Sequence, residues 1–294
     1  MTIFAVLGAC TVLAAWWAPA RLERAAWTIR SVRTAIALWC ALLGFCAMAV
    51  AMGLHQLLAG GHSTAWLPGR LTGHHRIPSE GIPGHVEALA LAAAVFAVLT
   101  AVVAADCLKA ARARARHRQL LDLIARPTED GTLRVDDPRA AAWCVPGRGG
   151  RIVLTRGADE QLTAPQLAAV IAHERAHLRG RHHLLVVGAR AVGRTLPWLP
   201  LTRLAARRIP VLCEMAADDA AVRTVGRDAL ARALCRIATH SAPEGALAAG
   251  MDAAVERVLR LTAPQRASTV AARAAGWVGV VVLPLLPVLI ACGP

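Results

Sequence analysis

Cysteine motifs are missing from this chain, and their absence excludes two classes of protein. The sequence has eight cysteines but no Cys-x-x-Cys pair, and about half of them lie in apolar stretches, where cysteine behaves as a small hydrophobic residue. A disulfide framework and a cysteine-based zinc site are therefore not expected. We expect free thiols, which suit a membrane or a reducing compartment.

Aromatic residues and lysine are also scarce, which bears on how the positive charge is used. The formal net charge is +14, from 33 basic and 19 acidic residues, and Lys109 is the only lysine. Aromatic residues make up 4% of the chain, and no aromatic-rich basic stretch or nucleic-acid-binding motif is found. Direct binding of nucleic acid is therefore not expected. Basic residues that flank membrane segments account for the charge instead.

Apolar sequence, by contrast, is abundant. Hydrophobic residues make up 56% of the chain and its mean hydropathy is +0.47, too apolar for an ordinary soluble domain. Four runs approach the ~20 residues that a helix needs to cross a bilayer. They cover residues 2–20, 34–54, 88–105 and 274–292. The first run could be a cleaved signal peptide, but it lacks a basic start and arginines follow it, which favours an uncleaved anchor.

The distribution of arginine predicts how these runs are oriented. Basic residues gather in residues 21–33 and 109–118, whereas the loop over residues 59–85 has only two arginines. By the positive-inside rule, the first two regions are cytoplasmic and the loop lies outside. We therefore expect three transmembrane helices in residues 1–108, a cytoplasmic domain over 109–273 and a fourth transmembrane helix over 274–294. The protein would then be a multi-pass protein of the inner (plasma) membrane with both termini outside.

One further apolar segment, residues 183–205, carries three arginines. An arginine near the centre of a span costs at least ~2.5 kcal/mol on insertion scales. The sequence favours an amphipathic or re-entrant hairpin against the inner face of the membrane. A fifth span is the alternative, and it would invert the orientation of everything after it.

The motif that indicates chemistry begins at His173 and ends at His177, and reads H-E-x-x-H. On a helix, these histidines lie one turn apart on one face and can hold one zinc ion, while Glu174 can act on the activated water as a general base. The context predicts such a helix. Thr163 is a good N-cap, Gln166 completes a capping box, and a glycine ends the helix.

The segment before this helix predicts a small β-sheet. Residues 141–145 and 151–155 are strand candidates, and the Pro-Gly-Arg-Gly-Gly stretch between them is typical of a hairpin. Residues 127–137 are expected to form a loop. The second strand contains Ile152, Val153 and Leu154, which could bind an extended substrate by strand addition.

A catalytic zinc ion needs a third protein ligand, and a downstream segment offers one. Glu214 and Asp218 are four residues apart, so they share a face of the next helix. Glu214 would complete a His2Glu site, and Asp218 would accept a hydrogen bond from a ligating histidine, with Asp219 as the competing choice. His182 and His183 are expected to be solvated.

A donor for the reacting oxyanion is also needed. The sequence leaves three candidates open. They are His240, Arg223 and Arg227.

These features resemble the membrane-bound gluzincin metallopeptidases. In those families an "IVLT-G" strand precedes H-E-x-x-H, followed by E-x-x-x-D and a late "R-x-x-R-L". The chain has these elements at residues 152–157, 173–177, 214–218 and 257–261. The resemblance implies an α+β membrane protein with four transmembrane helices and a mainly helical, zincin-type cytoplasmic domain carrying a small β-sheet and one Zn²⁺ ion.

Two families share this set of motifs. One consists of the beta-lactam-sensor antirepressor peptidases, which cleave a cytoplasmic repressor, and the other of the HtpX-like quality-control peptidases. The order of segments is closer to the antirepressor group. The chain stops at Pro294 without the sensor domain and has no Ser-x-x-Lys acylation motif, so a sensor-less short member is expected.

The expected function is therefore that of a zinc endopeptidase in the membrane. Its protein substrate would be a winged-helix transcriptional repressor or another cytoplasmic or membrane-proximal protein. The alternatives are an HtpX-like quality-control protease and a non-catalytic membrane receptor or scaffold.

Overall fold

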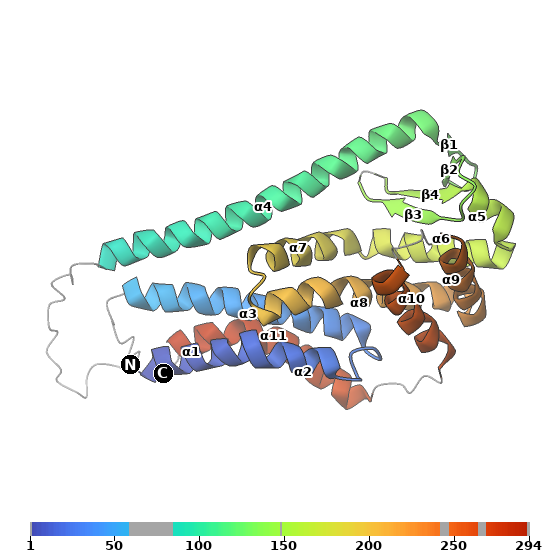
Figure 1. The fold of residues 1–294 in the computed structure, drawn as a ribbon. Coiled ribbons are helices and arrows are strands. Elements are labelled where there is room, and N and C mark those ends of the chain that lie inside the picture. The colour runs from blue at the N-terminus through green and yellow to red at the C-terminus, as the bar shows by residue number, and fades with distance from the viewer. Residues whose placement is uncertain (1, 59–84, 148, 242–246, 264–268, 293–294) are drawn as a thin grey trace, which may run out of the picture.

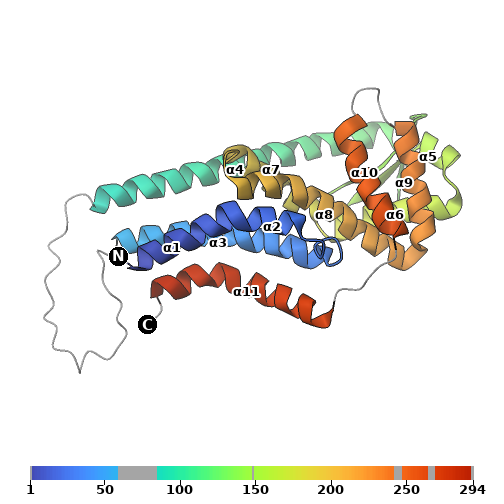
Figure 2. The same ribbon diagram turned by 60° about the horizontal axis from the view of Figure 1, so that its bottom comes forward.

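Three helices in the described part of the chain are long and apolar enough to cross a membrane. The computed structural model describes residues 2–58, 85–147, 149–241, 247–263 and 269–292. The first candidate span runs from α1 (Thr2–Val12) through a short π-helical stretch (η1, Leu13–Trp17) into α2 (Ala18–Arg24). The second is formed by α3 (Val32–Leu58) and the third by α11 (Val270–Cys292). These helices lie side by side in both views (Figures 1 and 2).

Three of the four predicted apolar runs thus correspond to these helices. The third run, residues 88–105, lies in α4 (His85–Ile124), a single 40-residue helix that continues past the apolar part into the basic segment. Its passage through the membrane therefore stays a prediction. Residues 59–84 of the predicted outer loop lie outside the described residues.

The ambiguous segment over residues 183–205 forms most of a helical hairpin. It contains α7 (His182–Thr195), a turn, and the start of α8 (Pro200–Val225). The predicted alternative of a fifth span has no support, because this segment is not among the three candidate spans of the described residues. On α7, Arg194 binds Asp106 of α4 through two nitrogens, at 3.0 and 2.9 Å. A carboxylate therefore neutralises one of the arginines that argued against a span.

The sheet has four short strands in the order β1-β2-β4-β3. β3 (Ala142–Val145) and β4 (Arg151–Thr155) form the predicted antiparallel hairpin. The loop expected over residues 127–137 is wrong in part, because it contains β2 (Leu133–Val135) and the end of β1 (Arg126–Pro127). Neither strand is long enough to give a readable alternation of polar and apolar residues.

The position of β4 corrects one prediction about substrate binding. β4 pairs with β2 in parallel on one side and with β3 on the other, and Ile152, Val153 and Leu154 are all buried. A strand that is paired on both sides has no free edge for a substrate. The strand at the open edge of the sheet beside the site is β3.

The remaining helices complete this part of the molecule. They are α5 (Arg156–Gln161), α6 (Ala164–Arg179), α9 (Arg227–Ser241) and α10 (Leu247–Thr262). Of these, α5 and α6 pack on the sheet, α9 packs on α6 and α8, and α10 packs on α9. In Figure 1, they lie at the end of the molecule opposite to the start of α1. The largest hydrophobic core lies between the membrane helices and α8, on which α6 and α9 pack. Residues of α3 and of the middle of α8 belong to this one cluster.

Candidate metal centre

Helix α6 presents the two histidines of the H-E-x-x-H motif. The predicted capping box is confirmed: the Thr163 backbone N–H donates to Gln166 at 3.0 Å, and the Thr163 side chain caps the helix in return. Gly180 is the C-cap, as predicted. His173 and His177 project from the same face of this helix, and their Nε2 atoms lie 3.0 Å apart. The two ring nitrogens therefore converge on one point.

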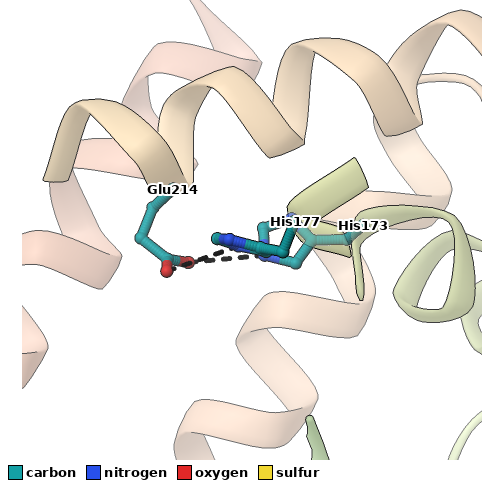
Figure 3. A group of neighbouring side chains, drawn as sticks. All are labelled: His173, His177 and Glu214. Atoms are coloured by element: carbon teal, nitrogen blue, oxygen red, sulfur yellow. Dashed lines mark hydrogen bonds and ion pairs between the residues drawn. The ribbon is translucent and has the colours of Figure 1, made fainter. Parts of the chain in front are cut away.

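Glu214 approaches the same point from α8 (Figure 3). Its Oε2 lies 3.3 Å from Nε2 of His173, and its Oε1 lies 3.4 Å from Nε2 of His177. One ligand atom from each of the three residues can be chosen so that all lie within 4.8 Å of one another. The structure thus brings together the three residues that the sequence proposes as metal ligands.

Asp218, one turn further along α8, holds the far side of the His173 ring. Its Oδ1 lies 2.9 Å from Nδ1 of His173, which is close enough for an ion pair, although the ring N–H does not point straight at the oxygen. Asp218 is fully buried. Asp219 is not the partner of this ring, because it pairs with Arg260 of α10 at 2.7 Å.

His182 corrects the expectation of a solvated side chain. The residue is buried, and its Nδ1 lies 3.1 Å from Nδ1 of His177. Burial, together with the neighbouring His177, lowers the pKa of His182 to about 4. A neutral ring offers one acceptor nitrogen, so His182 can accept the N–H of His177 and leave Nε2 of His177 free to bind a metal.

The backbone at the end of α6 places His182 beside the site. Arg181 has a φ of 49°, in the left-handed region that side chains rarely adopt, and α7 begins immediately after it. A Cβ added at Gly180 would lie 2.4 Å from Nε2 of His182. The sharp turn and the missing side chain together let the chain fold back against α6 within one residue.

Arg257 of α10 is a member of the site that received no role in the sequence prediction. Its guanidinium binds both oxygens of Asp218, at 2.7 and 2.8 Å, and its Nη1 lies 3.0 Å from Oε2 of Glu214. The only signal for it in the sequence is its place at the start of the late R-x-x-R-L motif. A bidentate pair of this kind fixes the orientation of a carboxylate as well as its charge.

The electrostatics of the cluster favour a bound cation. Burial opposes ionisation of Glu214, but the two histidines and Arg257 outweigh it and hold the pKa of Glu214 well below its usual range. Burial likewise acts to lower the pKa of His173, yet Asp218 and Glu214 raise it to about 9. Two carboxylates thus stabilise positive charge at the point where the histidine nitrogens meet.

A cavity of about 420 Å³ opens onto this cluster. Glu174 lines it beside His173 and His177, and so do residues of β3 and the apolar side chains of α9. Burial and the neighbouring carboxylate of Glu174 raise the pKa of the Cys144 thiol on β3, so this thiol stays protonated. The cavity therefore offers a carboxylate and an open strand edge next to the cluster.

The two oxyanion candidates whose side chains the structure describes, Arg223 and Arg227, do not line this cavity. Arg223 lines a different cavity, and Arg227 is exposed at the start of α9. The side chain of His240 lies outside the described residues. Among the described residues that line the cavity, Arg257 is the only arginine.

The donor set fits a zinc ion. Two imidazole nitrogens and one carboxylate form the His2Glu set of catalytic zinc sites, which leave a further position open. Both histidines have partners at Nδ1, which leaves Nε2 of each ring directed at the common point.

The fold and this site define a membrane-associated metallopeptidase. Residues 107–272, more than half of the chain, match the sequence profile of peptidase family M48. The chain therefore belongs to peptidase family M48, whose members are typically zinc-dependent. No curated protein and no solved structure matches it.

Proposed function

We propose that His173, His177 and Glu214 hold one zinc ion and that Glu174 is the general base of a zinc endopeptidase. The observation that carries this proposal is the convergence of both Nε2 atoms and the Glu214 carboxylate beside a cavity lined by Glu174. A zinc ion bound there would polarise the scissile carbonyl and make water a stronger nucleophile at neutral pH. The Glu174 carboxylate takes the proton from that water and passes it to the leaving amine.

Three other side chains hold this machinery in place. Asp218 fixes His173, and His182 fixes His177, each through the ring nitrogen that faces away from the cluster. Arg257 holds the Asp218 and Glu214 carboxylates in one orientation. The open edge of β3 binds the substrate as an added strand, through backbone groups that tolerate many sequences.

The finer role we propose is the cleavage of a regulatory protein, such as a winged-helix repressor, at the cytoplasmic face. The attachment of the site to the membrane helices supports a regulated enzyme. Cys213 and Met215 flank Glu214 and pack in the same core as Trp39 of α3. Arg260 ties α10 to the segment between α2 and α3, because its Nε donates to the carbonyl of Ile29 at 2.8 Å. A shift of these helices would move Glu214 and α10, which carry the site.

The substitution Glu174→Gln tests both levels of this proposal. The amide removes the general base but no ligand, so bound zinc should stay at one ion per chain while cleavage falls by about 10²–10⁴-fold. The measurement is metal content together with proteolysis by the purified full-length protein. Equal cleavage by wild type and variant would refute the catalytic assignment.

The same variant identifies the substrate, because an inactive peptidase retains what it binds. Enrichment of one soluble repressor with the Glu174→Gln protein, and its processing only when wild type is present, would support the regulatory role. Enrichment of many damaged membrane proteins would instead point to quality control. A wild-type protein that neither binds zinc nor cleaves would be a non-catalytic receptor.

A further inference from the structure

A second cavity, of about 590 Å³, lies behind the metal centre and shares no lining residue with the cavity described above. It is formed where four helices meet. Arg33 comes from the start of α3, Arg179 from the end of α6, His182 and Leu185 from α7, and Arg223 from the end of α8. Nothing in the peptidase chemistry uses this space.

The lining of this cavity is strongly cationic. It contains three arginines and no aspartate or glutamate, and its histidine, His182, is neutral. Arg33, Arg179 and Arg223 are exposed, and none of them forms an ion pair with a carboxylate among the described residues. Other arginines nearby do have such partners, including Arg257 and Arg260. Three unneutralised guanidinium groups around one cavity favour an anion between them.

The place of the cavity in the membrane bundle indicates what kind of anion. Arg33 is the second residue of the candidate span Val32–Leu54, so it lies where the apolar helix begins. Ile36, one turn further into the span, and Leu185 of α7 add apolar side chains to the lining. The cavity thus offers positive charge on one side and hydrocarbon on the other, at the expected level of the lipid headgroups.

We propose that this cavity is a binding site for the phosphate group of an anionic phospholipid. Guanidinium groups bind phosphate through two parallel hydrogen bonds, and basic pockets at the ends of membrane helices are suited to anionic headgroups. The glycerol and upper acyl chain of the lipid lie against Ile36 and Leu185. Inorganic phosphate shares the chemistry of the headgroup and is the other source of the same ligand.

Paired substitutions in the full-length protein test this site. The double variant Arg179→Gln/Arg223→Gln removes two charges from the cavity, and Arg112→Gln/Arg116→Gln removes two exposed charges from the basic part of α4. Native mass spectrometry with phosphatidylglycerol against phosphatidylcholine measures lipid binding, and ³¹P NMR with inorganic phosphate measures the free ion. We expect the wild type and the α4 variant to retain one phosphatidylglycerol, and the cavity variant to bind it about tenfold or more weakly.

Each outcome decides the proposal. Binding of phosphatidylglycerol or of inorganic phosphate that is lost only in the cavity variant supports the site, and the probe that binds identifies the source. Equal losses in both double variants would show general surface attraction and overturn it. Unchanged binding in the cavity variant would also overturn it. The same holds if an acidic peptide binds at the cavity while neither phosphatidylglycerol nor inorganic phosphate does. If the double variant does not fold, the single variants Arg179→Gln and Arg223→Gln provide the same comparison.

Discussion

At the scale of single residues, the site depends on side chains that hold the proposed ligands rather than on the ligands alone. Each histidine of the motif meets a partner at Nδ1: Asp218 for His173 and His182 for His177. Such partners set the tautomer and the direction of the ring, and their loss typically weakens metal binding. The neighbouring His183 makes no such contact in the described structure, although it is the same residue type one position away.

The role of His182 predicts a difference between these two adjacent histidines. We expect His182→Ala to weaken zinc binding by about 10–100-fold, because the His177 ring loses the partner that fixes its tautomer. His183→Ala is the matched control and should bind zinc as the wild type does. Zinc affinity measured by competition with a chelating dye checks this, and equal affinities of the two variants would contradict it.

Arg257 should matter for stability because it neutralises two carboxylates at once. Replacing it by Met removes the guanidinium that binds both the buried Asp218 and the Glu214 carboxylate, which should lower the free energy of unfolding by about 3–5 kcal/mol. The stability of Arg257→Lys should lie between those of the wild type and Arg257→Met, because an ammonium group keeps the charge but cannot reproduce the bidentate contact.

The exposed pair Arg232–Asp228 supplies the control for Arg257. Its nitrogen and oxygen lie 3.7 Å apart and both side chains are largely exposed, so Arg232→Met should change stability by less than about 1 kcal/mol. Thermal unfolding in detergent measures both variants. A loss no greater for Arg257→Met than for Arg232→Met would rule out the buried clamp.

At the scale of elements, the connection between α6 and α7 decides what the site contains. Among the residues that the structure describes, Arg181 is the only non-glycine residue with a positive φ. This conformation turns the chain so that α7 starts with His182 facing His177. A left-handed residue other than glycine costs roughly 1–2 kcal/mol. The turn therefore retains a local strain that places the His182 side chain beside His177.

Substitutions at Arg181 should separate backbone strain from side-chain contacts. Arg181→Gly relieves the left-handed conformation and should not lower the melting temperature, whereas the β-branched Arg181→Val should lower the free energy of unfolding by about 1–2 kcal/mol. The Arg181 side chain is exposed, so few contacts are lost in either variant. A melting temperature that falls more for glycine than for valine would show that the conformation is not the determining factor.

At the scale of the whole molecule, the peptidase domain and the membrane helices share one hydrophobic core. Residues of α3 and α8 pack together on both sides of Glu214, and α4 runs from the level of the membrane helices to the sheet (Figure 1). The site therefore lies close to the end of the bundle at which α3 begins. A change in the packing of α3 against α8 would therefore act on the helix that carries Glu214.

The proposed orientation gives a test at this scale. Reporter fusions at residue 150, in the turn between β3 and β4, should report the cytoplasm, because the positive-inside rule predicts that side for the basic segments 21–33 and 109–118. Fusions at residues 70 and 294 should report the outside. A signal for the outer side at residue 150 would overturn the orientation, and the proposed cytoplasmic substrate with it.

The sequence by itself determined the local features of this protein. The capping box at Thr163, the spacing of His173 and His177 on one helical face, and the apolar lengths of α3 and α11 depend on neighbours within a few turns. The same local logic predicted the β3–β4 hairpin but missed β2, whose three residues are held by pairing with β4. It also proposed substrate pairing with β4, which has no free edge because it is paired on both sides.

Only the tertiary structure decided the rest, because those features join residues far apart in the chain. Arg257 reaches Asp218 across 39 positions, and the cationic cavity needs Arg33 and Arg223 at one place. His182 was near enough in sequence to be considered, but its burial depends on the turn that folds α7 back against α6 and on the packing of α7 on α8. Sequence spacing thus fixes which groups share a helical face, while the contacts between helices fix which of them meet.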